Sequence, residues 1–317
     1  MLIVVSLIVV VPAAGAPYQT ISVRRDAIRF PPPGRLVDVG GRRLHIVCIG
    51  EGRPTVIVEE SSLSSSVSFA AARAEISARA RVCSYDRMGM AWSDPGPPII
   101  SIGTLADDLE RLLDRAVASP PYVIVSASMG GLVAELFARR HHDLVAGLVF
   151  VDAGHRGVLE YAAPRVTATM KTSACLLPVA ARLGLLRLVD PLGLRRQLPD
   201  SADAIFRIYR AEPMATFCAI VRGLPDTLRE FREAPPLAPG VPLTVLTAET
   251  TEGLIPGGYA AEEPTLARDW RDLQQQLSRR SSRGTWRIVP GSNHLIAESQ
   301  PHAVAGAVLE MLGAVQR

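Results

Sequence analysis

Short apolar runs alternate with longer segments of helical spacing along most of this chain. Each run has three to eight residues, and most are rich in Val and Ile, which is typical of buried strands. These runs are Arg35–Val39, Arg43–Cys48, Pro54–Glu59, Arg81–Tyr85, Val123–Val125, Leu144–Val151, Pro242–Thr247 and Thr285–Val289. Helical spacing covers Leu105–Ala116, Leu132–Ala138, Trp270–Leu277 and His302–Val315. Thr104, with Asp107 and Asp108, is predicted to cap the start of the helix Leu105–Ala116. The alternation predicts an α/β fold, a mostly parallel sheet with helices on both faces.

The alternation stops between the strand that ends at Val151 and the one that begins at Pro242. Residues 154–240 contain apolar helical segments such as Leu176–Leu188 and Ala202–Tyr209. Prolines interrupt them at positions 191, 199, 213 and 225. We interpret 154–240 as a helical cap that lies over the strand ends. The α/β core is then predicted to comprise residues 35–153 and 241–317.

The N-terminal sixteen residues, Met1–Ala16, are almost wholly apolar. They are shorter than the ~20 residues of a spanning helix, and they predict a signal peptide or a membrane anchor. Pro12 and Gly15 argue against a buried N-terminal helix. Residues 17–34 are predicted to be a linker that ends in the stiff Pro31–Gly34 segment. The protein is therefore expected to be membrane-associated or exported, and cytoplasmic if this segment has no such role.

Composition limits the classes of partner. The chain has 317 residues, 48% of them hydrophobic, and a net charge of only +3. Its basic pI of 8.8 comes from scattered arginines, because Lys171 is the only lysine. This distribution gives no basic patch for nucleic acid. The sequence has no CxxC, HExxH or phosphate-binding glycine loop, so we expect no metal and no other cofactor.

The segment Tyr122–Ala138 holds the strongest candidate for chemistry. Its strand turns at once into a helix around Ser128, with only small or flexible neighbours from Ser126 to Gly131. Such a turn presents a serine hydroxyl at the end of the sheet, beside the free N–H groups of the helix. The usual pattern is G-x-S-x-G, and here Ser126 replaces the first glycine.

Several motifs occur in a characteristic order: YDRMGMAWSDPGP, SASMGG, LVFVDAGH, the cap, and GSNHLI. In this order the chain resembles the α/β-hydrolase fold superfamily, particularly bacterial members with an N-terminal apolar segment. The resemblance runs from about Gly34 to the C-terminus and implies a sheet of about eight strands. It also implies that Ser128 is the nucleophile and His294 the base. His45, His141, His142 and His302 fit that position less well.

The acid that would orient His294 is less clear from the sequence. Some relatives place it after the strand that follows the nucleophile, which here gives Asp152. Most relatives take it from the loop after Pro242–Thr247, which here gives Glu252 or Glu249. We expect Asp152, with Glu252 as the alternative.

The resemblance further implies an oxyanion hole made of the backbone N–H groups of Met129 and Ser62. Relatives carry glycines in the loop that contains Ser62, whereas this chain carries serines. Asp86 and Arg87 are expected to brace loops near the site. Trp92 is expected either to line the pocket or to pack in the core.

The sequence does not decide whether the four cysteines form disulfides or remain free thiols. In this fold Cys48 and Cys83 lie on neighbouring strands and are able to pair if the domain is exported. Two buried free thiols are the commoner outcome for cysteines within a sheet. Cys175 and Cys218, in the cap, are expected to have no special role.

Three functions fit these residues. The first is a serine hydrolase that cleaves a small or medium hydrophobic ester, lactone or amide through an acyl-enzyme on Ser128. The second is perhydrolysis of the haloperoxidase type. The third is a hydrolase-like binding protein with impaired catalysis, which the altered elbow, the serine-filled loop and the undecided acid favour. Dehalogenases and epoxide hydrolases are disfavoured because they carry Asp at the position of Ser128.

Overall fold

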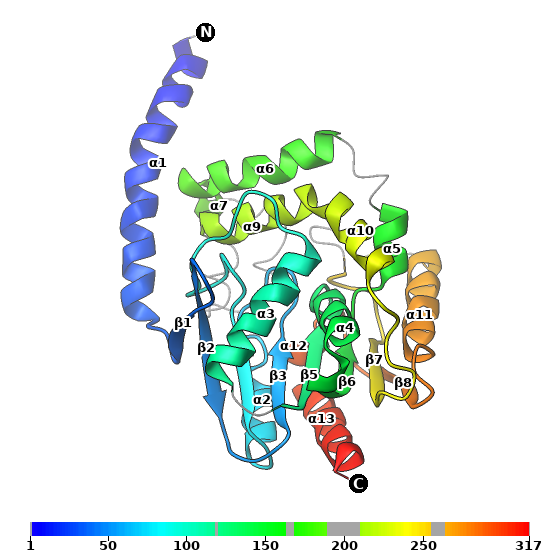
Figure 1. The fold of residues 1–317 in the computed structure, drawn as a ribbon. Coiled ribbons are helices and arrows are strands. Elements are labelled where there is room, and N and C mark those ends of the chain that lie inside the picture. Colours follow the sequence, from blue (N-terminus) through cyan, green and yellow to red (C-terminus); the bar gives the residue numbers. More distant parts are fainter. Residues whose placement is uncertain (1, 118–119, 163–167, 189–209, 255–263, 317) are drawn as a thin grey trace.

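A computed structural model describes the backbone of residues 2–117, 120–162, 168–188, 210–254 and 264–316. Its centre is one eight-stranded sheet with the order β1-β2-β4-β3-β5-β6-β7-β8 (Figure 1). The strands are β1 (Arg35–Asp38), β2 (Arg43–Ile49), β3 (Thr55–Glu59), β4 (Val82–Tyr85), β5 (Tyr122–Ala127), β6 (Val145–Val151), β7 (Leu243–Ala248) and β8 (Gly284–Val289). β2 runs antiparallel to β1 and β4, and the strands from β4 to β8 are mutually parallel. The predicted α/β class and all eight predicted strands are confirmed.

Helices cover both faces of the sheet because its central strands are apolar on both sides. Ile124 of β5 belongs to one core cluster with Leu109 of α3 (Ile102–Ala116) and Val133 of α4 (Gly130–Arg140). Val123 belongs to a second cluster on the other face. That cluster includes residues of α2 (Ala70–Ser77), α12 (Ile296–Ser299) and α13 (Pro301–Val315). Two core layers therefore hold β5, and with it Ser128, rigidly in the centre.

The start of α3 differs from the prediction. The helix begins at Ile102, and its N-cap is Ser101, whose hydroxyl accepts a hydrogen bond from the Thr104 N–H at 3.1 Å. Thr104 is thus inside the first turn rather than at the cap. A serine oxygen satisfies one of the free N–H groups at the helix start equally well.

Five described helices lie between β6 and β7, over the carboxyl ends of the strands (Figure 1). They are α5 (Arg156–Ala162), α6 (Ala168–Arg182), α7 (Leu185–Leu188), α9 (Ala211–Arg222) and α10 (Leu224–Glu233). The predicted helix Leu176–Leu188 corresponds to parts of α6 and α7, which Gly184 separates with a positive φ of 70°. The predicted helix Ala202–Tyr209 lies outside the described residues.

The N-terminal region departs most from the prediction. Residues 2–29 form one helix, α1 (Leu2–Arg29), so residues 17–29 are helical rather than a linker. Gly15 lies within this helix, where it packs against the turn between α6 and α7: a Cβ there would lie 2.2 Å from the Leu183 carbonyl oxygen. None of the described helices is both long enough and apolar enough to cross a membrane.

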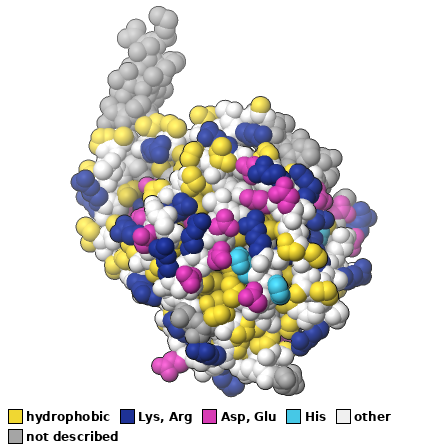
Figure 2. All heavy atoms as spheres, in the orientation of Figure 1, with side chains coloured by type: hydrophobic (Ala, Val, Ile, Leu, Met, Phe, Trp, Pro, Cys, Tyr) yellow, Lys and Arg dark blue, Asp and Glu magenta, His cyan; other side chains and the backbone are white. Residues whose placement is uncertain are grey.

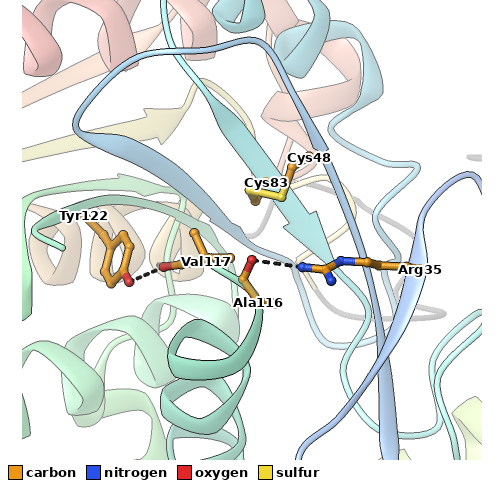
Figure 3. Close-up of a disulfide and its surroundings, with 6 residues drawn as sticks. All are labelled: Arg35, Cys48, Cys83, Ala116, Val117 and Tyr122. Carbon is orange, nitrogen blue, oxygen red and sulfur yellow. Dashed lines mark hydrogen bonds between the residues drawn. A yellow bond between two sulfur atoms is a disulfide. The ribbon is translucent and has the colours of Figure 1, made fainter. Parts of the chain in front are cut away.

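All four cysteines are paired in disulfides, which corrects two expectations. Cys48 and Cys83 face each other across β2 and β4 and form one bond (Figure 3). Cys175 of α6 and Cys218 of α9 form the other, so the cap cysteines do have a structural role. The second pairing was missed because nothing in the sequence brings α6 against α9. Disulfides across 35 and 43 residues stabilise a fold mainly by constraining its unfolded chain.

Hydrogen bonds tie the edge of the sheet to the C-terminal end of α3 beside the first disulfide. Arg35 of β1 donates to the Ala116 carbonyl at 3.1 Å, and the Tyr122 hydroxyl donates to the Val117 carbonyl at 2.6 Å (Figure 3). These bonds satisfy carbonyls at the end of α3 that have no partner within the helix. They also fix the beginning of β5, at whose far end the candidate nucleophile lies.

Candidate active site

Ser128 lies in a tight turn between β5 and α4. It has a φ of 48°, a left-handed conformation that is uncommon for residues other than glycine. Its carbonyl accepts hydrogen bonds from the N–H groups of Gly131 at 2.9 Å and Gly154 at 2.6 Å. A Cβ on Gly130 would lie 2.3 Å from the Glu60 carbonyl oxygen. The turn therefore needs glycine at 130 because it is pressed against the loop after β3.

The side chains of Ser128, His294 and Asp152 form a continuous chain of hydrogen bonds. His294 Nε2 lies 2.9 Å from Ser128 Oγ, and His294 Nδ1 lies 2.6 Å from Asp152 Oδ2. Because a carboxylate only accepts, Nδ1 carries the proton and Nε2 is left to accept the Ser128 proton. The three residues come from the ends of β5, β6 and β8, which meet at the carboxyl edge of the sheet.

Asp152 is held by partners other than His294. Its Oδ1 accepts hydrogen bonds from the Ala248 N–H at 3.0 Å and from Trp270 Nε1 at 2.9 Å. Trp270, from α11 (Pro264–Ser278), also packs edge-on against the His294 ring, with 5.9 Å between ring centroids. Asp152 has a φ of 45°, so a second strained turn aims this carboxylate at the histidine.

The two alternative acids, Glu252 and Glu249, make other contacts than Asp152 does. Glu252 meets His294 only through the main chain, where its carbonyl accepts from the His294 N–H at 2.9 Å. The Glu249 carboxylate accepts from the Gly291 N–H at 2.7 Å. Both residues thus shape the loop that carries His294, while Asp152 is the carboxylate that contacts its ring. The sequence favoured Asp152 only through its resemblance to relatives that place the acid after the strand that follows the nucleophile.

The predicted oxyanion donors lie on adjoining segments. Met129 is the residue before α4, and Ser62 lies in the loop that follows β3. Arg87 braces that loop, because its guanidinium donates to the Glu60 carbonyl at 2.7 Å and also to the Ser61 carbonyl. The expectation that Arg87 braces a loop near the site agrees with these contacts.

Arg87 is itself held by a fully buried carboxylate, that of Glu59. Its Nη1 lies 2.6 Å from Glu59 Oε1, and the Tyr85 hydroxyl donates to the other oxygen. Burial raises the pKa of Glu59, and the charge of Arg87 and the hydrogen bonds from Tyr85 and Arg87 oppose that rise. This ion pair is enclosed beneath the loop that contains Ser62 and fixes the path of its backbone.

Asp86 and His45 form a second buried brace. His45 Nδ1 donates to Asp86 Oδ2 at 2.7 Å, and its Nε2 accepts from the Gly34 N–H at 3.1 Å. The other Asp86 oxygen accepts from the Ser66 N–H at 2.7 Å, within the segment after β3. Trp92 packs against the His45 ring and donates to the Phe30 carbonyl at 3.0 Å, so its role is packing.

A cavity of about 10 Å³ lies beside Ser128 and His294, which is room for about one water molecule. Polar residues and Phe69 line one side, and the segment that follows His294 lines the other. The lining comprises Glu60, Ser61, Ser64, Ser68, Phe69, Ala127, Ser128, His294, Leu295, Ile296, Ala297 and Glu298. Among the described residues, no group of three or more His, Cys, Asp or Glu side chains has a geometry that holds a metal ion.

The sequence analysis missed a role for His155, which follows Asp152 by three residues. Its Nε2 lies 2.9 Å from Arg280, which also pairs with the buried Glu135 of α4. Burial, and then the positive charges of Arg280 and Arg156, lower the pKa of His155 to about 4. His155 therefore stays neutral at the start of the cap.

Comparison with known families agrees with this fold and this arrangement. The sequence model of the Alpha/beta hydrolase family matches residues 61–307, more than three quarters of the chain. This chain belongs to the Alpha/beta hydrolase family. The matched region includes Ser128, Asp152 and His294.

Curated relatives are mostly longer proteins. An uncharacterized protein of Schizosaccharomyces pombe is 30% identical over 217 residues, which are 68% of this hydrolase and 38% of that protein. The probable transporter efuK of Hormonema carpetanum is 31% identical over 140 residues, 41% of this chain and 19% of that protein. The chain thus spans well under two thirds of these relatives. By contrast, the uncharacterized protein YqjL of Bacillus subtilis, 22% identical, matches over 83% of this chain and 85% of its own.

Solved structures share the fold at low sequence identity. A thermophilic esterase from Thermogutta terrifontis has a TM-score of 0.63 at 21% identity, with 90% of this hydrolase and 100% of that chain covered. An enol-lactonase from Burkholderia xenovorans has a TM-score of 0.60 at 20% identity, covering 88% and 100%. A variant of potato epoxide hydrolase has a TM-score of 0.67 at 16% identity, covering 88% and 98%. The shared architecture thus accommodates more than one hydrolytic chemistry.

Proposed function

We propose that this hydrolase is a carboxylic ester hydrolase that acts on small or medium hydrophobic esters through an acyl-enzyme on Ser128. The observation that carries the proposal is the chain of hydrogen bonds from Ser128 through His294 to Asp152. A serine hydroxyl is a weak nucleophile until an adjacent base takes its proton. Lactones and activated amides would react by the same route.

In the first step Ser128 Oγ attacks the ester carbonyl carbon while His294 Nε2 takes the hydroxyl proton. Asp152 keeps Nδ1 protonated and stabilises the imidazolium that forms. The N–H groups of Met129 and Ser62 stabilise the negative charge on the carbonyl oxygen. His294 then gives its proton to the leaving alkoxide, and the C–O bond breaks to release the alcohol.

In the second step water hydrolyses the acyl-enzyme. His294 takes a proton from the water as its oxygen attacks the acyl carbon, and returns the proton to Ser128 Oγ as the acid leaves. The cavity beside Ser128 and His294 has room for about one water molecule.

The residue at position 128 supports ester rather than epoxide chemistry. Epoxide hydrolases of this fold use an aspartate there, whose carboxylate attacks carbon directly. Ser128 needs a proton acceptor instead, and His294 Nε2 is within 2.9 Å of it. The shared fold with an epoxide hydrolase therefore does not carry that reaction over to this hydrolase.

A fluorophosphonate probe tests the proposal because it reacts only with an activated serine. We expect stoichiometric labelling at Ser128, located by peptide mass spectrometry, and hydrolysis of p-nitrophenyl acetate faster than of long-chain p-nitrophenyl esters. Ser128→Ala should abolish both reactions while leaving the circular dichroism spectrum unchanged.

Absence of labelling in folded protein would refute the proposal and favour a binding protein with impaired catalysis. A perhydrolase would label equally well. It is distinguished by peracid formation from the acid and hydrogen peroxide at a rate that exceeds ester hydrolysis.

A further inference from the structure

Exposed hydrophobic side chains are concentrated on α1, α6 and α7. Six of the ten large hydrophobic side chains that are exposed among the described residues lie on these three helices. Five of them, between 48% and 72% exposed, form what we call the outer apolar surface: Tyr18, Ile21, Leu176, Val179 and Leu188. Tyr18 and Ile21 are three residues apart, as are Leu176 and Val179, so each pair shares one face of its helix.

Direct contacts join the three helices into one surface. The backbones of α1 and α6 approach closely at Gly15 and Leu183. Arg187 of α7 lies 2.5 Å from Asp26 and 2.8 Å from Gln19, both on α1. Figure 2 shows hydrophobic side chains gathered where α1 meets the cap.

We propose that the outer apolar surface binds a lipid bilayer that carries anionic headgroups. Residues 2–12, which continue α1 toward the N-terminus, consist of Leu, Ile and Val apart from Ser6 and Pro12. Figure 1 shows this end of α1 projecting past the cap helices, on the side of the molecule where α6 lies. The strength with which a surface binds a bilayer grows with the apolar area that it buries and with its attraction to anionic lipids.

The charges around the surface complement anionic lipid. Arg24 and Arg25 are exposed on α1, and Lys171 and Arg182 are exposed on α6. α6 contains no acidic residue, and Asp26 of α1 is engaged by Arg187. Basic side chains around an apolar surface add attraction to negatively charged headgroups. A half-exposed tyrosine such as Tyr18 also suits the headgroup level of a bilayer.

Bound in this way, the bilayer would lie against the helices that cover the active site. Ala181 of α6 and Leu186 of α7 belong to the same buried cluster as Leu63, from the loop that contains Ser62. Met214 of α9 belongs to this cluster as well, so the cap helices pack against that loop. The outer apolar surface is thus continuous with the cap and does not include the proposed catalytic residues.

Sedimentation of the full-length protein with lipid vesicles tests the proposal without any measurement of activity. We expect binding to phosphatidylcholine vesicles, and stronger binding when about a third of the lipid is phosphatidylglycerol, by about fivefold for each engaged arginine. The double variant Ile21→Asp, Leu176→Asp should weaken binding to both by at least about tenfold, because two apolar contacts become charged. The variant Arg24→Gln, Arg25→Gln should keep the binding to phosphatidylcholine vesicles and lose only part of the preference for the anionic vesicles, because Lys171 and Arg182 remain.

The matched control is Ile99→Asp with Ile288→Asp, two residues that are 54% and 39% exposed but lie on none of α1, α6 and α7. It should bind vesicles as the unaltered protein does. Equal binding by the Ile21→Asp, Leu176→Asp variant would overturn the proposal, because residues 2–12 alone would then hold the lipid. Absence of vesicle binding together with a dimer that this variant dissociates, measured by light scattering, would identify the surface as a contact between two copies.

Discussion

The active-site loops and the helices α6 and α7 are held in place in different ways. Around Ser128, buried charged groups and backbone hydrogen bonds fix each segment from several sides, as Arg87 does for the loop that contains Ser62. By contrast, α6 and α7 are held by one disulfide to α9, by a small apolar cluster and by α1. The chemistry of this hydrolase is therefore built into the sheet, while the cap that covers it can change without disturbing the triad.

The largest expected effect is the loss of kcat when Asp152, at the end of β6, is replaced. Asp152→Asn should lower kcat by about 10⁴-fold, because an amide leaves His294 in the wrong tautomer. Glu252→Gln should change kcat by less than about twofold, since only its main chain contacts His294. Steady-state kinetics on one p-nitrophenyl ester measure both, and comparable losses would show that Asp152 is not the acid.

The next effect concerns the buried pair beneath the loop that contains Ser62. Arg87→Gln should lower the free energy of unfolding by about 3–5 kcal/mol, because it leaves the Glu59 carboxylate buried without its cation. Adding Glu59→Gln should restore part of that loss. Urea denaturation measures both variants, and equal stabilities of the single and double variants would mean that the pair is not coupled.

The cap should respond differently to the loss of its disulfide. Cys175→Ser with Cys218→Ser should cost about 4 kcal/mol, as expected for a loop closed over 43 residues. The loss should appear as faster proteolysis within the cap, with labelling of Ser128 by a fluorophosphonate retained. Cys48→Ser with Cys83→Ser is the matched comparison in the sheet and should lower the Tm of the whole domain. Identical proteolytic cleavage patterns in the two variants would show that the cap does not open independently of the sheet.

The smallest effect is the pH dependence that His155 introduces at the junction of sheet and cap. Its pKa is about 4 in the folded protein and near 6.5 when unfolded, so the unfolded chain binds more protons between these values. The free energy of unfolding should therefore fall as the pH drops from about 6.5 through 4. His155→Gln should reduce the loss of unfolding free energy between about pH 7 and pH 4.5 by about 2 kcal/mol, measured by denaturation at these two pH values. An unchanged slope would assign the acid sensitivity to other groups.

The sheet was predictable because each strand is a continuous apolar run between turn residues. The meeting of Ser128 and His294 was predictable as well, because both follow strands whose carboxyl ends lie at one edge. The choice between Asp152 and Glu252 was not decided by the sequence, since the φ of 45° at Asp152 and the Trp270 bond depend on the folded loops. The length of α1 was mispredicted because Gly15 was taken as a helix breaker, when it is a point of close helix contact.

The position of Asp152 has a consequence for how the sequence of this protein can diversify. With the carboxylate placed after β6, the segment that follows β7 has no reacting group to supply. Insertions or deletions in that segment beyond Glu252 can then be tolerated as long as His294 keeps its main-chain support. The segment after β7 is thus open to sequence change, whereas the first turn after β6 is closed to it.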